Sequence, residues 1–322
     1  MAVYVNTNYS ALQGQRYLGN VQNSLTTTYQ RLSSGLRINS AKDDAAGLQI
    51  ADRLTSQING LNQGNRNASD GIALAQTMEA GMDEISGMLQ KIRTLTVQAN
   101  NGTNTAEDRK ALGKEVESLA NEINRIATQT TFAGKKILDG KSKADGSSIF
   151  GDDAQNGAQV GKAGSEGTMT LQVGSNKGDV IEFKMTSVRF STLGTDQNVL
   201  ANADKIFKTN ATSGVITVKF STAKTDNGAE SLGAVINLVD SMIATIDGKR
   251  ADLGAIQNRL ESSIRNQSNV AANEADARSR IRDADFAEES ANLSQQSIIQ
   301  QAAASMLMQA NTRPQLGLSL LG

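Results

Sequence analysis

The stretch LSSGLRINSAKDDAAGLQIADR occupies residues 32–53 and separates two segments that have the residue spacing of helices. Its first half is rich in Ser, Gly and Asn, which end helices or form turns more readily than they continue them. We expect Gly35 and Asn39 to break the first helix. Ser40 and Asp43 have the spacing of a capping box, so we expect Ser40 to be the N-cap of the next helix.

A heptad pattern precedes this break. Its positions are separated by 3, 4, 3 and 4 residues and comprise Leu18, Val21, Leu25, Thr28 and Leu32. This period is typical of helices that pack along one another. The pattern therefore predicts a helix with one face against a partner helix.

Two further helices are predicted after the break. Apolar residues keep helical spacing from Ile50 to Leu95, and the sequence NNGTN at residues 100–104 then indicates a turn. Thr105 and Asp108 have the spacing of a capping box at the start of the second helix. Because the turn is short, we expect these two helices to lie antiparallel.

The middle of the chain has a different composition. Residues 140–167 contain seven Gly, which indicates a loop. Apolar residues then alternate with polar ones at 169–173 and again at 181–185, with a turn signal at 175–178. This pattern predicts a β-hairpin with one apolar face.

Residues 186–231 are mixed in character and predict a small surface insert. Within it we expect a short helix around Val199–Phe207 and a strand through Ile216, Val218 and Phe220. Helical spacing returns at Leu232 and keeps a single heptad frame to Leu260. A looser helical pattern then continues to the C-terminal region.

Both ends of the chain carry very little charge. Residues 1–30 contain one charged side chain, Arg16, and residues 290–322 contain one, Arg313. Disordered tails are usually charged and poor in aliphatic residues, unlike these ends. Copies of such segments can pack closely without like-charge repulsion. We therefore expect the two ends to pair and to become ordered only in a polymer, in a mainly α protein of long antiparallel, coiled-coil-like helices with a small β-containing central insert.

Composition excludes several other functions. The formal net charge of −1 gives no general attraction to nucleic acid, and no apolar run is long enough for membrane insertion. The chain has no Cys and no His, so thiol nucleophiles, Ser-His-Asp triads and nearly all zinc sites are absent. We expect no enzyme activity, no metal and no cofactor.

Several segments resemble bacterial flagellin in order and spacing. They are LSSGLRINSAKDDAAGLQIADR (32–53), RNASDGIALAQ (66–76), LGAIQNRLESSI (253–264), SRIRDADFAEESANLS (279–294) and IIQQAAASMLMQAN (298–311). The resemblance covers nearly all of residues 1–140 and 232–322. It implies a structural subunit that assembles itself into the extracellular flagellar filament used for swimming.

The resemblance also implies a division of the chain. An inner helical domain comprises residues 1–39 and 279–322, and an outer domain comprises 40–185 and 232–278. Residues 186–231 form a variable surface insert. Residues 33–43 are the expected linker, with a mirror linker near Ala271–Arg280.

The terminal segments carry the implied assembly seam. Its residues are Leu18, Val21, Leu25, Leu32, Leu293, Ile298, Ala302 and Met306. Besides copies of itself, the implied partners are an export chaperone, the filament cap and the hook-junction proteins. The first residues, MAVYVNTNYS, lack the basic and apolar regions of a secretory signal peptide, consistent with export through the flagellar type III apparatus without signal cleavage.

One host partner is also implied. Residues 90–98 resemble the stretch recognised by the flagellin-sensing Toll-like receptor, with contact positions at Lys91, Leu95 and Glu115. Members that signal strongly commonly have Arg at the position of Lys91. Lys lacks the planar fork of Arg, so we expect weaker recognition. The alternative is that this face serves to pack neighbouring subunits.

Two other functions were considered. A hook–filament junction or cap-type subunit shares terminal heptads, but not the pair of motifs at 32–53 and 279–294. Some flagellins carry a zinc protease marked by HExxH in the insert, and the lack of His excludes that form here.

Overall fold

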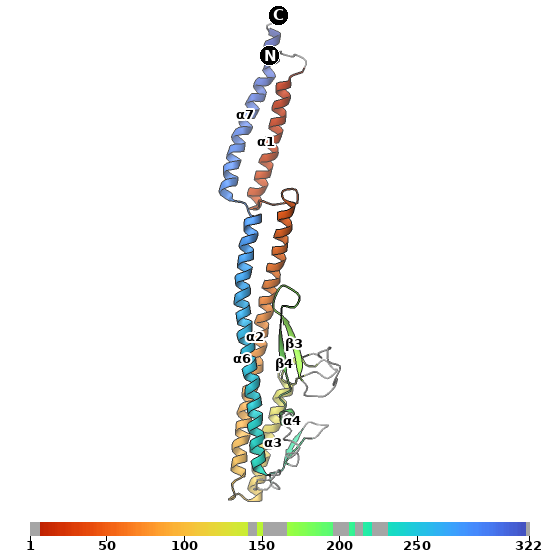
Figure 1. Ribbon diagram of the computed structural model, residues 1–322, viewed down its shortest axis with the longest axis vertical. Coiled ribbons are helices and arrows are strands. Elements are labelled where there is room, and N and C mark those ends of the chain that lie inside the picture. Colours follow the sequence, from red (N-terminus) through yellow and green to blue (C-terminus); the bar gives the residue numbers. More distant parts are fainter. Residues whose placement is uncertain are drawn as a thin grey trace. The chain divides into compact units, whose positions relative to one another are not determined.

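The computed structural model describes residues 7–140, 147–150, 166–195, 206–209, 215–220 and 231–319. The chain divides into two compact units. The terminal unit comprises residues 1–59 and 269–322, and the central unit comprises residues 60–268. The predicted mainly α fold with long helices and a small β-containing insert is confirmed (Figure 1).

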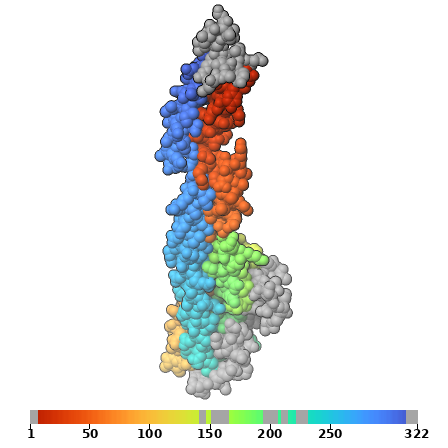
Figure 2. All heavy atoms as spheres, turned by 45° about the horizontal axis from the view of Figure 1, so that its top comes forward, coloured from red at the N-terminus to blue at the C-terminus, as the bar shows by residue number. Residues whose placement is uncertain are grey.

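The terminal unit is built around two antiparallel helices, α1 (Tyr9–Ser34) and α7 (Phe286–Ser319). They lie side by side in Figure 1 and touch along their surfaces in Figure 2. The start of α2 (Ala45–Ala99) and the end of α6 (Leu232–Arg282) complete this unit.

In the central unit, the remainder of α2 and α6 pack with α3 (Ala106–Gln129) (Figure 1). Apolar side chains spaced by three and four residues on each helix form the buried core, as the 3.6-residue period requires. The capping box predicted at the start of α3 is confirmed. The amide of Asp108 donates to Thr105 Oγ1 at 3.2 Å, and the amide of Thr105 donates to Asp108 Oδ2 at 3.0 Å.

Three short antiparallel strand pairs lie in the central unit. They are β1 (Thr131–Phe132) with β2 (Lys135–Lys136), β3 (Gly167–Gln172) with β4 (Val180–Met185), and β5 (Phe207–Thr209) with β6 (Ile216–Val218). The β3–β4 pair is the predicted hairpin, in which Met169 lies opposite Phe183 and Leu171 opposite Ile181. Figure 2 shows the hairpin, in green, against α6, in cyan.

The region after the hairpin differs from the sequence-based prediction in part. Helix α4 (Phe190–Thr195) was not predicted, and Phe207 begins a strand instead of ending a helix. The rest of the helix expected around Val199 lies outside the described residues. The strand at Ile216 is confirmed as β6. Phe207 packs between Phe190 and Phe220, with ring centroids 5.1 and 6.4 Å away, so aromatic burial fixes this region.

Candidate functional site

The contact between α1 and α7 is close because small residues lie in it. A Cβ atom on Gly14 of α1 would lie 3.1 Å from Leu307 Cδ1 of α7, so the missing side chain lets Leu307 approach the helix backbone. Near the same end, Asn8 Nδ2 donates to the carbonyl oxygen of Ala310 at 2.8 Å. Asn8 is also the N-cap of α1 and accepts from the Ala11 amide. Asn8 therefore links the start of α1 to α7.

An ion pair fixes the opposite end of the contact. Arg31 Nη1 lies 3.1 Å from Glu289 Oε1, and the Glu289 residue is only 6% exposed. A buried carboxylate is stable only when it is paired, so this ion pair favours one alignment of the two helices. Neither residue was predicted from the sequence, because no local pattern connects positions 258 residues apart.

The break after α1 uses the predicted residues Gly35 and Asn39. Gly35 has a φ of 70° and its amide donates to the Arg31 carbonyl at 2.8 Å, which is the left-handed C-cap that Gly favours. The Asn39 side chain donates to Ser34 Oγ at 2.7 Å and to the Gln30 carbonyl at 3.3 Å. Asn39 therefore contacts the last turn of α1 from outside the helix.

The prediction that Ser40 is the N-cap of the next helix is wrong. α2 begins at Ala45, and Asp44 is its cap, because Asp44 Oδ1 accepts from the Gly47 amide at 2.9 Å. Ser40 and Asp43 form a separate turn before the helix. Asp43 Oδ2 accepts from the amides of Ser40 at 2.9 Å and Asn39 at 3.1 Å, and these bonds hold the pKa of Asp43 below its ordinary value.

The C-terminal break lies later than predicted. α6 continues through the whole of 271–280 to Arg282, and the chain leaves helical conformation only at residues 283–285. There Asp285 Oδ1 accepts from the Ala287 amide at 2.8 Å, so Asp285 caps α7. The expected mirror linker is therefore corrected to this short segment. The reason is that 271–280 contains only good or neutral helix formers, without Gly or Pro.

The two breaks are hydrogen-bonded to each other. Leu36 and Asp283 form an antiparallel bridge. The amide of Arg37 donates to the Arg282 carbonyl at 2.7 Å, and the amide of Ala284 donates to the Gly35 carbonyl at 3.0 Å. The backbone groups freed at one helix end are thus satisfied by those freed at the other.

The predicted seam residues of α1 face α7. Leu25 is buried, and Leu18, Val21 and Leu32 are half-buried on the same face. Of the predicted seam residues on α7, Leu293 alone is half-buried. Ile298, Ala302 and Met306 are exposed in the isolated chain, with Ile298 67% and Met306 71% exposed.

The predicted seam residues of α7 beyond Leu293 do not face α1 within the chain. The α7 positions that face α1 include Gln296, Gln300, Ala303, Leu307 and Ala310, which are half-buried. Apolar residues occur all around α7, so a heptad count on the sequence does not select the face that contacts α1. The apolar residues of the predicted α7 seam beyond Leu293 lie on an outward face.

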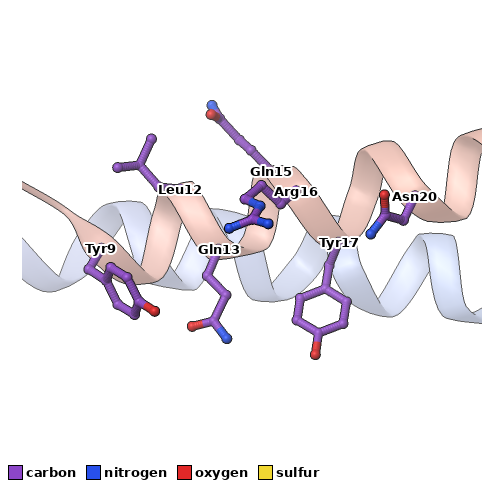
Figure 3. A pocket seen from close by; sticks show the side chains of 7 residues that line it. All are labelled: Tyr9, Leu12, Gln13, Gln15, Arg16, Tyr17 and Asn20. Carbon is purple, nitrogen blue, oxygen red and sulfur yellow. The ribbon is translucent and has the colours of Figure 1, made fainter.

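The outward face of α1 is also apolar and almost uncharged. Tyr9, Leu12 and Tyr17 are more than half exposed, Tyr9 by 73%. A hollow along this helix is lined also by Gln13, Gln15, Arg16 and Asn20. In Figure 3, Tyr9 and Tyr17 point to one side of α1 and Leu12 to the other. Large exposed apolar side chains that lie near one another, as Tyr9 and Tyr17 do, are typical of interaction surfaces.

The predicted receptor contact lies in the central unit. Lys91 on α2 and Glu115 on α3 form an ion pair of 2.9 Å, and both side chains are largely exposed. Leu95 is only 8% exposed and belongs to the core. The structure thus places Lys91 and Glu115 together at the surface and Leu95 beneath it.

No group of three or more acidic side chains suited to a metal ion occurs among the described residues. In the same part of the chain, no helix combines the length and apolar character needed to cross a membrane.

Comparisons with known proteins agree with this architecture. Residues 5–143 match the family model of the bacterial flagellin N-terminal helical region, and residues 236–321 match that of the C-terminal helical region. Flagellin A of Vibrio cholerae serotype O1 is 37% identical and flagellin D of Vibrio anguillarum 36% identical to this chain, and each alignment covers 100% of both proteins. A solved structure of a putative flagellar hook-associated protein from Vibrio parahaemolyticus is similar in fold, with a TM-score of 0.57 at 20% identity, over 75% of this chain and 100% of that one.

Proposed function

This chain belongs to the bacterial flagellin family of filament subunits, and we propose that the outward faces of α1 and α7 are the surfaces through which its copies join. Flagellin is a structural protein family, and the chain is not an enzyme. The observation that carries the proposal is the exposure of large apolar side chains on a nearly uncharged helix pair. Tyr9 and Tyr17 on α1, and Ile298 and Met306 on α7, lie outside the contact within the chain.

These faces suit association with further copies for two reasons. Burial of each large apolar side chain contributes about 1.5–3 kcal/mol, so several together favour association strongly. The near absence of charge removes the repulsion that identical surfaces would otherwise feel. The proposal also keeps the division into an inner domain of 1–39 with 279–322 and an outer domain of 40–185 with 232–278, with 186–231 as the surface insert. The helix break at 35–44 supports the first boundary, and the second break lies at 283–285, a few residues after 279.

The test separates contacts within the chain from contacts between chains. Ile298→Asp places a charge on the outward face of α7, and we expect a folded monomer that forms no filaments in seeded polymerisation viewed by electron microscopy. Leu25→Asp places a charge in the buried α1–α7 contact. We expect it to reduce both the helicity of the monomer, measured by circular dichroism, and filament formation.

Gln301→Asp is the matched control for charge, because Gln301 is exposed on the same helix and is already polar, so the change removes no apolar side chain. We expect it to retain polymerisation better than Ile298→Asp. Normal filaments from Ile298→Asp would refute the role given to the outward face.

Family membership supports further partners. We propose that the subunit leaves the cell unfolded through the flagellar type III apparatus, without cleavage of a signal peptide. An export chaperone, the filament cap and the hook-junction proteins are its proposed partners along that route. The filament itself is extracellular in the family.

A host receptor contact is proposed at the Lys91–Glu115 pair. Both side chains are accessible on the described surface, and they lie on neighbouring helices. Leu95 is proposed to support this surface from below, since its side chain is buried. Purified monomer applied to cells that carry the flagellin-sensing Toll-like receptor tests this contact, and a Lys91→Ala variant that signals as strongly as the parent would contradict it.

A further inference from the structure

Two methionines stand apart from the others in their exposure. Met306 is 71% exposed and Met308 is 66% exposed, both on α7. Met78, Met82, Met185 and Met242 are at most 1% exposed, and Met88 and Met169 are partly buried. Access of an oxidant to the thioether sulfur is the main determinant of methionine oxidation. Among the described methionines, Met306 and Met308 are therefore the ones open to attack in the free subunit.

The two exposed methionines lie on different flanks of α7. Successive residues of an α-helix are about 100° apart, so Met306 and Met308 point about 200° apart, with the half-buried Leu307 between them. One flank of α7 carries three residues spaced by four, Ile298, Ala302 and Met306. Ile299 lies next to this flank. Met306 thus belongs to the apolar part of the proposed assembly surface.

Met308 has polar neighbours instead. Gln301 and Ser305 precede it by seven and three residues and share its flank, and Ser305 Oγ donates to the Gln301 carbonyl at 3.0 Å. Polar side chains thus precede Met308 on its flank, whereas Ile298 and Ala302 precede Met306 on its own flank and Gln309 follows it by three residues. The two methionines are matched in exposure and differ in surroundings.

We propose that oxidation of Met306 to methionine sulfoxide is a switch that keeps the free subunit from polymerising, an inference that rests on the proposed assembly surface. A peroxide supplies the oxygen. The O–O bond of hydrogen peroxide breaks and an S–O bond forms, the sulfur is oxidised by two electrons, and water is released. The sulfoxide oxygen is a strong acceptor that water solvates in the free subunit, and its burial in an apolar contact with another copy opposes assembly. Assembly in turn buries Met306 and protects it.

The first experiment needs no variant. The monomer is oxidised partially with hydrogen peroxide, the peroxide is removed with catalase, and polymerisation is seeded. Filaments and unpolymerised protein are then separated, and the sulfoxide at each methionine is quantified by peptide mass spectrometry. We expect Met306 sulfoxide to be enriched about tenfold or more in the unpolymerised fraction, whereas Met308 sulfoxide is shared nearly equally. Equal Met306 sulfoxide in both fractions overturns the proposal.

Two matched variants sharpen the result. Met306→Leu keeps the apolar volume and removes the reactive sulfur, so it should polymerise after peroxide treatment at close to its untreated rate. Met308→Leu retains Met306 and should lose polymerisation on oxidation as the parent does. Equal loss in both variants overturns the proposal.

Ile298→Asp distinguishes failure of this inference from failure of the proposed function. If unoxidised Ile298→Asp forms normal filaments, the assembly surface itself is wrong. If Ile298→Asp does not assemble but fully oxidised parent protein does, the surface stands and only the oxidation switch is refuted.

Discussion

Replacing Gly64 by Ala should displace the β3–β4 hairpin from α2. A Cβ atom on Gly64 would clash with the carbonyl oxygen of Val173 and would lie 2.7 Å from its carbonyl carbon. Both atoms belong to the backbone just after β3, so no side-chain rotation relieves the clash. Overpacking of this kind costs about 1–3 kcal/mol, and a backbone obstacle places Gly64→Ala toward the upper end.

A second glycine of the same helix provides the control. Gly87 is exposed. Apart from its chain neighbours and the backbone of its own helix, no atom of the described residues lies within 4 Å of a Cβ built there. Gly→Ala in a helix ordinarily stabilises it by about 1 kcal/mol, and this gain applies to both positions. The difference in stability between Gly64→Ala and Gly87→Ala therefore isolates the hairpin contact, at about 2–3 kcal/mol.

Thermal unfolding of the purified monomer, followed by circular dichroism, measures this difference. For a unit of this size, about 2–3 kcal/mol corresponds to a gap of about 4–12 °C between the two melting temperatures. Amide hydrogen exchange should also quicken in the hairpin of Gly64→Ala and stay unchanged in Gly87→Ala. Equal melting temperatures for the two variants would refute the close contact between Gly64 and Val173.

Four further predictions concern three charged residues and one core position. Arg31→Ala should destabilise the terminal unit by about 1–2 kcal/mol, because it leaves the carboxylate of Glu289 buried without its partner. Replacing both residues by Met and Leu should restore part of the lost free energy of unfolding, measured by urea unfolding. The pKa of Asp43 is lowered from 3.8 by backbone hydrogen bonds from Ser40 and Asn39, so its stabilisation of the turn is present above that pH and is lost as the pH falls through the lowered value. Amide exchange near Asn39 should lose protection there in the parent, and Asp43→Ala, which has no side-chain acceptor, should lack that protection at every pH. Lys91→Arg should strengthen receptor signalling in a reporter-cell assay, because Arg adds a planar fork. Leu95→Ala should lower the stability of the monomer by about 2–3 kcal/mol, because it removes core packing.

Local sequence signals predicted the parts of the fold that local chemistry determines. Thr105 and Asp108 lie three residues apart and satisfy each other's backbone amides, so the start of α3 needed no knowledge of distant residues. The alternation through Met169 and Ile181 likewise determined the hairpin and its register.

A capping-box spacing misled the prediction at the start of α2. The spacing of Ser40 and Asp43 predicts Ser40 as the N-cap, whereas Asp44 caps the helix. Burial of Ile38 accounts for the difference. Its side chain is 1% exposed, and a Cβ on Gly47 would lie 2.7 Å from Ile38 Cδ1, so the linker lies against the first turn of α2 and the helix begins after Asp44.

The face of α7 depended on distant residues and was not predicted. Leu307 faces α1 because Gly14, about 290 positions earlier in the chain, leaves room for it. Glu289 is buried because Arg31 lies opposite. The spacing of apolar residues within α7 cannot indicate either contact, because both partners lie on α1.

The ion pair between Arg31 and Glu289 has a consequence for any polymer built from this chain. Sliding α7 along α1 by one helical turn would move the carboxylate by about 5.4 Å relative to the guanidinium and leave it without a counter-charge. Every copy is thereby held to the same offset between its two ends. A lattice of identical units can repeat over long distances only if each member has the same length and surface, and this ion pair favours that uniformity in every copy.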